Sequence, residues 1–214
     1  MPMRWIIDVL LPEKCVSCNL KGSVICDKCV PKLRRVERET GSNIHALYDY
    51  RDPAIKRAIW KLKYHHRKNI GDKLGQLLFE EFAEDISEIH QYLDNQPIYV
   101  IPIPISKEKL RKRGYNQSLT IAKGFCDCSS KNLELKDNLV IKTKETIPQA
   151  KIANRIKRLN NIKGVFKIKN EEFIKGKTFI IIDDVTTTGA TLTEIYKLLK
   201  NAGAKKILCF AVAH

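Results

Sequence analysis

The sequence lacks any apolar segment long enough to cross a bilayer, and it contains no internal repeat and no low-complexity tract. Its first residues hold two short apolar runs separated by Asp8, without the small-residue cleavage site of a signal peptide, so we expect no such peptide. These absences exclude a membrane-spanning protein and favour a cytoplasmic one. In that compartment the seven cysteines are expected to be thiols or metal ligands rather than disulfides.

Acidic residues are scarce relative to basic ones. The chain has 24 Asp and Glu against 39 Lys and Arg, which gives a net charge of +15. Such an excess favours polyanionic partners: nucleic acid, phosphorylated ligands or an anionic membrane face. The alternative is a lysine-rich surface with no such partner. The length of 214 residues and the hydrophobic content of 43% predict one sizeable domain with a small additional module.

The most informative stretch runs from Thr178 to Thr191 and predicts a strand, a small loop and a helix. Four strand-favouring apolar residues, Phe179 to Ile182, indicate a strand buried on both faces. Asp183 and Asp184 are expected to end this strand, and a helical pattern begins at Leu192. The loop between them contains Thr186, Thr187, Thr188, Gly189, Ala190 and Thr191.

This loop has the chemistry of a phosphate site beside a site for ribose hydroxyls. Free backbone N–H groups, threonine hydroxyls and the positive end of the helix dipole all favour a phosphate. The carboxylates of Asp183 and Asp184 would repel a phosphate, but they are good acceptors for the hydroxyl groups of ribose. The alternative is an ordinary strand-to-helix turn capped by Asp and Thr.

The nine residues from Asp183 to Thr191, DDVTTTGAT, resemble the phosphoribosyl pyrophosphate (PRPP) loop of type I phosphoribosyltransferases. In that family the two acidic residues bind the ribose 2′- and 3′-hydroxyls, and the loop after them binds the 5′-phosphate. The resemblance therefore implies that Asp183 and Asp184 bind ribose and that the following loop binds phosphate. It also implies Mg²⁺ bound to the pyrophosphate of PRPP.

Two C-x-x-C pairs near the N-terminus predict a metal site. Cys15 and Cys18 form the first pair, Cys26 and Cys29 form the second, and seven residues separate the pairs. Four cysteines with this spacing suit a tetrahedral Zn²⁺ ion and leave no coordination position open, so we expect the zinc to be structural. A redox pair is the alternative. A module of about 30 residues has too little core to fold without such an ion.

Two basic stretches are candidates for contacts with phosphate groups. The first, Lys56 to Lys68, lies on and just after a helix that Asp52 and Pro53 are expected to begin. The second, Lys107 to Arg113, has five positive charges within seven residues and follows a buried strand. Solvated surfaces are the alternative for both. The candidate residues for binding pyrophosphate or DNA are Lys63, Arg111, Arg113, Tyr115, Asn116 and Gln117.

Apolar patterns elsewhere in the chain alternate between strands and helices. Residues 98–101 and 206–213 are expected to be strands, and residues 71–93 an amphipathic helix. Asn116 is expected to cap a further helix, short helices are expected at residues 1–13 and 152–159, and the charged residues 32–40 are expected to be a linker or an exposed helix. This alternation predicts an α/β fold with a twisted, mainly parallel sheet flanked by helices. The expected division is an N-terminal helix and zinc module in residues 1–40 and a phosphoribosyltransferase-like domain in residues 41–214.

In combination these motifs resemble the ComF family. The resemblance rests on the four-cysteine module, Leu62 to Tyr64, Val100 to Pro104, Arg113 to Gln117, Thr146 to Gln149, Arg158 to Phe166 and the PRPP loop. ComF proteins are phosphoribosyltransferase-like competence proteins that help transforming DNA to reach the bacterial cytoplasm. The resemblance implies a PRPP-binding protein of the cytoplasm or its inner-membrane side, acting in DNA uptake during natural transformation. The implied partners are PRPP, single-stranded DNA and a DNA-translocating competence helicase.

Two functions are compatible with the sequence. One is a PRPP-binding protein that binds and handles single-stranded DNA, and the other is an enzyme that transfers phosphoribosyl from PRPP to a base or amine. In the purine-salvage enzymes of this fold, residues well after the PRPP-loop helix stack on the base. This sequence stops at His214, directly after the next expected strand, so we expect that wall to be absent. A hood over the acceptor could come instead from residues 42–95 or from the zinc module. We therefore favour the DNA-handling function, and we identify neither an acceptor site nor a catalytic residue.

Overall fold

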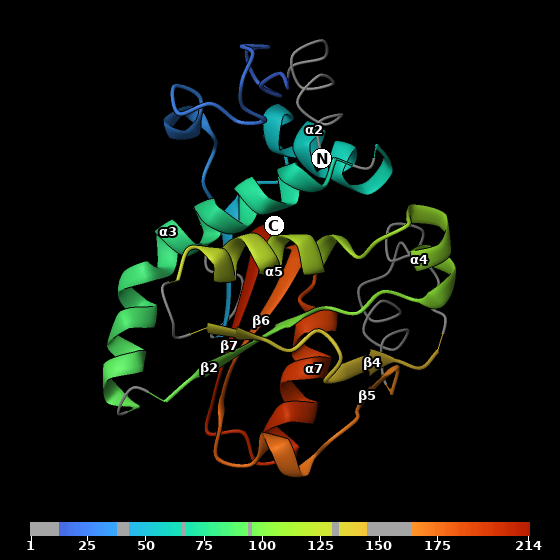
Figure 1. The fold of residues 1–214 in the computed structure, drawn as a ribbon. Coiled ribbons are helices and arrows are strands. Elements are labelled where there is room, and N and C mark those ends of the chain that lie inside the picture. Colours follow the sequence, from blue (N-terminus) through green and yellow to red (C-terminus); the bar gives the residue numbers. More distant parts are fainter. Residues whose placement is uncertain (1–12, 38–42, 66, 94–95, 130–132, 145–163) are drawn as a thin grey trace, which may run out of the picture.

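The computed structural model describes residues 13–37, 43–65, 67–93, 96–129, 133–144 and 164–214 (Figure 1). Two short helices expected from the sequence, at residues 1–13 and 152–159, lie almost wholly outside these ranges. Within the described part of the chain, no helix is both long and apolar enough to span a membrane.

A parallel sheet in the order β1-β7-β6-β2-β3 forms the centre of the described fold (Figure 1). Its strands are β1 (Ile44–Tyr48), β2 (Ile98–Pro102), β3 (Leu133–Leu135), β6 (Thr178–Val185) and β7 (Lys206–Ala213). Every neighbouring pair in this sheet is parallel. A separate antiparallel pair consists of β4 (Val140–Lys142) and β5 (Phe166–Ile168). This topology confirms the expected α/β class.

Helices cover both faces of the sheet, which gives three layers. They are α2 (Pro53–Tyr64), α3 (Lys68–Tyr92), α4 (Lys107–Arg113), α5 (Gln117–Asp127) and α7 (Ala190–Asn201), with 3₁₀ turns at Val30–Lys32 and Glu172–Ile174. Successive residues of β6 point to opposite faces. Ile180 and Ile182 belong to the core cluster that contains α3 and α5, whereas Phe179 and Ile181 pack in the cluster of α7. Burial on both faces explains why this strand is apolar without alternation.

Helices α3 and α5 approach each other so closely that only glycine fits at their contact. A Cβ atom on Gly75 would lie 2.1 Å from the carbonyl oxygen of Ile121, and one on Gly124 would lie 2.3 Å from that of Asp72. These are backbone atoms, which cannot move aside as a flexible side chain can. The position of α5, whose first turn faces β6, is therefore fixed by direct backbone contact.

The N-terminal cysteine segment packs on α2. Val16 and Ile25 belong to the same hydrophobic cluster as this helix, and Arg57 Nε donates a 2.9 Å hydrogen bond to the carbonyl oxygen of Val16. Asp52 caps the start of α2, as expected, and also accepts a 2.9 Å hydrogen bond from the backbone N–H of Arg34. The division into two domains at residue 40 stays a prediction.

Several element boundaries differ from those expected. Strand β6 continues through Asp183 and Asp184 to Val185, because parallel pairing with β7 extends to that residue. The charged residues after Val30–Lys32, expected as a linker or exposed helix, include Arg35, which forms an antiparallel bridge with Tyr48. The three-residue strand β3 was not expected, because so short a run has no detectable alternation.

Candidate functional site

The two acidic residues of the PRPP-loop motif lie at the carboxyl-terminal end of β6, in the middle of the sheet. Asp183 is aligned with Ala211 of β7, and Asp184 is buried. Ligands of open α/β sheets bind beyond the carboxyl ends of the strands, where loops and helix N-termini converge. The acid pair therefore occupies the position at which a ligand site is expected in this fold.

Asp184 forms an ion pair with Lys63 from the last turn of α2. The distance between Lys63 Nζ and Asp184 Oδ2 is 2.8 Å, and both side chains are largely shielded from solvent. Burial alone would lower the pKa of Lys63, but the charge of Asp184 and its hydrogen bond outweigh burial and raise it. Lys63 therefore remains charged and holds Asp184 in one orientation.

Asp183 has a different environment, at the first turn of α5. Its Oδ1 atom accepts hydrogen bonds from Ser118 Oγ at 3.1 Å and from the backbone N–H of Asp184 at 2.8 Å. Burial and the neighbouring charge of Asp184 raise the pKa of Asp183 to about 7. The two carboxylates thus differ: Asp184 is paired with a cation, whereas Asp183 gains a proton close to neutral pH.

The loop after the acid pair turns directly into α7. Thr186 is buried, and its backbone N–H donates to the carbonyl oxygen of Ala213 at 2.9 Å. Gly189 has the left-handed backbone angle φ of +70°, and a Cβ atom there would lie 2.7 Å from Ile44 Cδ1. Glycine is favoured at this position because of its left-handed backbone angle, whereas the terminal methyl group of Ile44 could shift to admit a Cβ atom. Thr187 is exposed and Thr188 is half-buried beside it, so the loop presents hydroxyl groups next to the start of a helix.

The sequence Arg113 to Gln117 connects α4 to α5 and faces the same end of the sheet. Asn116 caps α5, as expected, by accepting a hydrogen bond from the N–H of Ser118 at 3.1 Å. Arg113 Nη1 donates to Gln117 Oε1 at 2.7 Å. Tyr115 is only 7% exposed and its hydroxyl donates to the carbonyl oxygen of Leu62, so its ring is not available for stacking on a ligand.

An exposed group of aromatic side chains lies on α2 beside this connection. Trp60 and Tyr64 are 51% and 55% exposed, and the Trp60 ring lies 4.4 Å from that of His65. The guanidinium carbon of Arg113 lies 5.6 Å from the centre of the Tyr64 ring. We call Trp60, Tyr64, His65 and Arg113 the aromatic surface.

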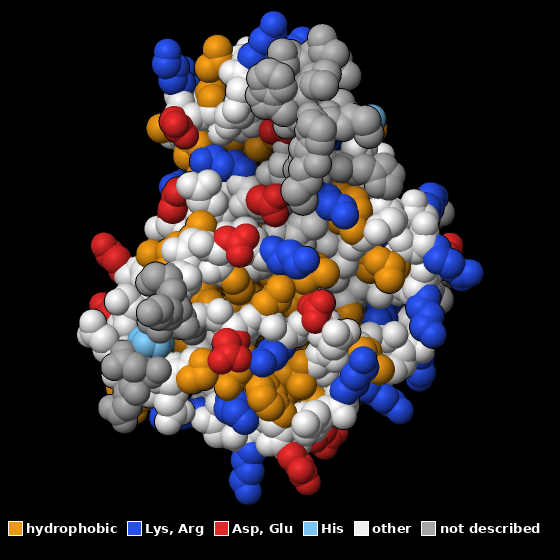
Figure 2. Space-filling model, in the orientation of Figure 1, with side chains coloured by type: hydrophobic (Ala, Val, Ile, Leu, Met, Phe, Trp, Pro, Cys, Tyr) orange, Lys and Arg blue, Asp and Glu red, His pale blue; other side chains and the backbone are white. Residues whose placement is uncertain are grey.

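The second basic stretch forms the short helix α4 rather than a loop. Its last turn contains Arg111, Lys112 and Arg113, and Arg111 is exposed. Figure 2 shows Lys and Arg side chains gathered along the edge of the molecule where α4 lies in Figure 1. This edge is a concentrated positive surface next to the aromatic surface.

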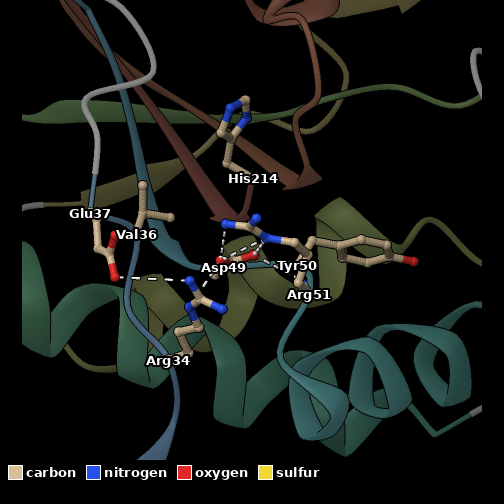
Figure 3. Close-up of a pocket in the computed structure, with 7 residues that line it drawn as sticks. All are labelled: Arg34, Val36, Glu37, Asp49, Tyr50, Arg51 and His214. Atoms are coloured by element: carbon tan, nitrogen blue, oxygen red, sulfur yellow. Dashed lines mark hydrogen bonds and ion pairs between the residues drawn. The ribbon is translucent and has the colours of Figure 1, made fainter.

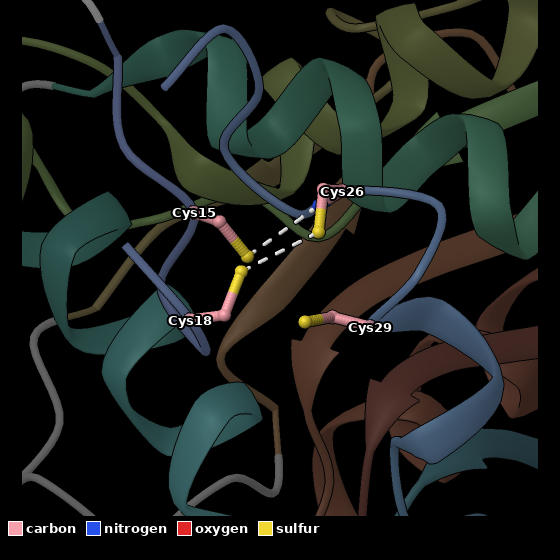
Figure 4. A group of neighbouring side chains, drawn as sticks. All are labelled: Cys15, Cys18, Cys26 and Cys29. Carbon is pink, nitrogen blue, oxygen red and sulfur yellow. Dashed lines mark hydrogen bonds between the residues drawn. The ribbon is translucent and has the colours of Figure 1, made fainter. Parts of the chain in front are cut away.

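The four cysteines of the N-terminal segment converge, as the spacing predicts (Figure 4). Their sulfur atoms lie within 4.8 Å of one another. Four sulfurs bound to one tetrahedral zinc ion are ~3.8 Å apart, so the group has nearly the required geometry. The backbone N–H groups of Ser17 and Cys26 point at Cys15 Sγ, at 3.4 and 3.5 Å. Four thiolates this close need a cation between them, and the cluster can therefore hold a metal ion.

A hollow of about 640 Å³ lies at the carboxyl ends of β1 and β7, next to the loop after the acid pair (Figure 3). Its polar lining centres on Asp49, which accepts from Arg51 Nη2 at 2.8 Å and pairs with Arg34 Nε at 3.2 Å. The hydrogen bonds from Arg51 lower the pKa of Asp49 to about 2. His214 Nδ1 lies 3.2 Å from the carbonyl oxygen of Thr186, which connects the hollow to the loop.

Sequence analysis missed two features of this site. It did not identify Ser118, which contacts Asp183, and it did not place Lys63 next to Asp184. The only signal for Ser118 was its place two residues after a helix cap. It also failed to identify any residue of the hollow, because Arg34, Asp49 and Arg51 come from segments without a recognisable motif.

Comparison with known proteins agrees with this geometry. A family model described as "Phosphoribosyl transferase domain" matches residues 111–214. Competence protein ComFC of Streptococcus pneumoniae is 30% identical over 202 residues, which cover 94% of this chain and 80% of the relative. DNA utilization protein YhgH of Escherichia coli O157:H7 is 28% identical over 198 residues, which cover 90% of this chain and 80% of the relative.

Among solved structures, a hypoxanthine phosphoribosyl transferase of Trypanosoma cruzi aligns with a TM-score of 0.42 at 10% identity, over 65% of this chain and 64% of that one. The matched family model and the sheet topology show that the region containing the acid pair has the type I phosphoribosyltransferase fold. With its similarity to the pneumococcal protein over almost the whole chain, this protein belongs to the ComF family.

Proposed function

We propose that this protein binds PRPP, as its magnesium complex, and handles single-stranded DNA during natural transformation, in the cytoplasm beside a DNA-translocating helicase. A structural zinc ion is held by the four cysteines. The observation that carries the proposal is the closeness of two different surfaces. Lys63 pairs with Asp184 of the acid pair, and the next residue, Tyr64, belongs to the exposed aromatic surface.

Support for PRPP comes from the complementarity between the acid pair and the loop that follows it. Carboxylates suit the 2′- and 3′-hydroxyls of ribose, and a loop rich in N–H and hydroxyl donors at the start of α7 suits a 5′-phosphate. Lys63, which is paired with Asp184, lies beside this arrangement and supplies positive charge for a pyrophosphate. Magnesium binds mainly through ligand phosphates and water, so it requires no dedicated cage of side chains.

Support for single-stranded DNA comes from the aromatic surface and the positive edge on α4. Aromatic faces stack on unpaired bases without reading their sequence, and positive groups follow the phosphate backbone. Because Tyr115 is buried, Trp60 and Tyr64 supply the exposed rings in this proposal. A duplex hides its base faces, so we expect single strands to bind more tightly than duplex of the same length.

The salt dependence of single-strand binding tests this part of the proposal. Affinity for an oligothymidine is expected to fall by ~0.7 log units per log unit of salt for each phosphate that is neutralised. Reversing Arg111 and Arg113 to glutamate should weaken binding and flatten that slope. The matched control reverses Lys197 and Lys200, which are also exposed but belong to α7, the helix that packs on the sheet face away from α3 and α5. Fluorescence anisotropy titrations at several salt concentrations provide the measurement.

The comparison between these two double variants decides the location of the DNA surface. Equal loss of affinity in both would mean that net charge, and not the α4 edge, governs binding. Wild-type affinity and slope in the Arg111/Arg113 variant would remove this surface from the proposal. If the wild-type protein does not bind single strands at low salt, the DNA-handling function itself is wrong.

Phosphoribosyl transfer to a base or amine is the second candidate function, and the hollow beside the loop favours it. The hollow offers hydrogen-bond donors from Arg34 and Arg51, the carboxylate of Glu37 and the ring of Tyr50. These groups suit a planar acceptor with a polar edge. The hollow is formed by the segments before and after β1 together with His214, which follows β7, so these residues would supply the acceptor wall.

Pyrophosphate release from magnesium PRPP tests the second candidate. If the protein is an enzyme, release should depend on an added nucleobase or amine, and Arg34→Gln should reduce it more than it reduces PRPP affinity. Arg34 is chosen because its side chain borders the hollow and makes no contact with the acid pair in the described structure. The absence of release with every acceptor tried, alongside measurable PRPP binding, would leave only the binding function.

A further inference from the structure

Two separate lines of contacts join the acid pair to the aromatic surface. The first is short: Asp184 Oδ2 lies 2.8 Å from Lys63 Nζ, and Lys63 is followed in α2 by Tyr64. Lys63 points inward to the carboxylate, whereas the Tyr64 ring is exposed. Both residues belong to the last turn of one helix, so a movement of either is transmitted to the other.

The second line starts at Asp183 and runs through the first turn of α5. Ser118 Oγ donates to Asp183 Oδ1 at 3.1 Å, and the preceding residue, Gln117, accepts from Arg113 Nη1 at 2.7 Å. The guanidinium group of Arg113 lies over the Tyr64 ring. The two lines therefore begin at the two carboxylates and meet at Tyr64.

Each proposed ligand competes for a contact on which the other site depends. A phosphorylated ribose brings phosphate oxygens that compete with Asp184 for the ammonium group of Lys63. Phosphates of a bound strand compete with Gln117 for the guanidinium group of Arg113. Gln117 is 1% exposed, so loss of that donor leaves a buried acceptor without its charged partner and loosens the turn that holds Ser118.

We infer that binding of a phosphorylated ribose at the acid pair and binding of an unpaired strand at the aromatic surface weaken each other. This inference rests on the proposed function and adds a regulation to it. The anionic charge of the ribose ligand acts in the same direction, because Lys63 at the acid pair and Tyr64 at the aromatic surface are consecutive residues, well within the ~8–10 Å over which salt screens incompletely. By linkage, each ligand must reduce the affinity of the other by the same factor, which we expect to be roughly 5- to 30-fold.

The test is a pair of titrations at fixed ionic strength and magnesium concentration. The dissociation constant of a labelled oligothymidine is measured by anisotropy at increasing concentrations of PRPP, and that of PRPP is measured by calorimetry with and without saturating oligothymidine. The expected result is a 5- to 30-fold weakening that reaches a plateau and is equal in both directions. A plateau shows that both ligands bind together.

Variants then identify the residues responsible. Lys63→Gln is expected to reduce the coupling factor to less than half, because it removes the first line of contacts. Lys56→Gln is the matched control: it removes one positive charge from an exposed position of the same helix and should change strand affinity without changing the coupling factor. An unchanged factor in Lys63→Gln would overturn the assignment to this line.

Three other outcomes would overturn the inference, and they differ in whether the proposed function is retained. Independent binding of the two ligands, or mutual strengthening, removes the coupling but leaves the proposed function intact. Weakening that grows without limit as PRPP is added means that the strand enters the PRPP site itself. Failure of the wild-type protein to bind strands removes the proposed DNA function and the coupling with it.

Discussion

Replacing Cys26 with serine should abolish metal binding and unfold the N-terminal cysteine segment. Zinc binding and folding of such a module are a single event worth ~10–16 kcal/mol, and three sulfurs cannot complete the tetrahedral site. The core of the segment is small, so it has little else to hold it together. The loss should extend to α2, because Val16 and Ile25 pack with this helix and Arg57 bonds to the carbonyl oxygen of Val16.

Native mass spectrometry provides the measurement, with one zinc ion per chain expected in the wild-type protein. The control is Cys128→Ser, because Cys128 is an exposed cysteine at the end of α5 and lies outside the cluster. That variant should retain its metal and its thermal midpoint. Freshly purified wild-type protein without zinc would end the metal hypothesis and leave the redox interpretation.

Removal of both carboxylates of the acid pair is expected to weaken PRPP binding by more than 100-fold. Each lost hydrogen bond to a charged group costs about 1.5–3 kcal/mol, and Asp183→Ala with Asp184→Ala removes at least two. The double change removes the repulsion between two adjacent buried acids but also leaves the shielded ammonium group of Lys63 without its carboxylate, so circular dichroism is used to verify the fold of the variant before its affinity is compared. Calorimetry with magnesium PRPP measures the effect, and Asp127→Ala, at the far end of α5, is the control. Unchanged PRPP affinity in the double variant would contradict the assignment of these residues to ribose.

The raised pKa of Asp183 gives this site a pH dependence whose sign differs between binding and stability. Below pH 7 the carboxyl group gains a proton and accepts ribose hydroxyl groups less strongly, so PRPP affinity should fall between pH 8 and pH 6.

Folding raises the pKa of Asp183 above the unfolded value of about 4, so the stability contributed by Asp183 is lost as pH rises through 7. Asp183→Asn should therefore raise the thermal midpoint at pH 8 and have little effect at pH 4. A larger gain at acid pH would show that the pKa is not raised.

The sequence predicts those parts of the structure that are specified by residues close to one another in the chain. Four apolar residues before an acid pair predict β6, and Asp52-Pro53 and Asn116 predict helix starts, because each signal acts within a single turn of chain. The four cysteines belong to the same class, since two short spacings largely determine the geometry of the group.

Contacts between distant segments were not predictable in this way. The flexible side chain of Lys63 gives no indication that its charge lies beside Asp184, which is more than a hundred residues away in sequence. Tyr115 follows a basic stretch, a pattern typical of nucleic-acid contacts, yet tertiary packing buries it against the carbonyl oxygen of Leu62. The hollow around Asp49 arises only when β1 is placed beside β7, and no local pattern specifies that pairing.

The pairing of β1 with β7 has a consequence for how the protein is made. Among the strands that the structure describes, β1 leaves the ribosome first and its partner β7 last, and no other neighbours in this sheet are so far apart in sequence. Until β7 emerges, β1 has no place in the sheet and the hollow beside it cannot form. Closing so long a loop is slow, and an unpaired strand promotes aggregation in the meantime. The four cysteines lie close together in sequence, from Cys15 to Cys29, so their cluster could hold a metal ion long before the sheet is complete.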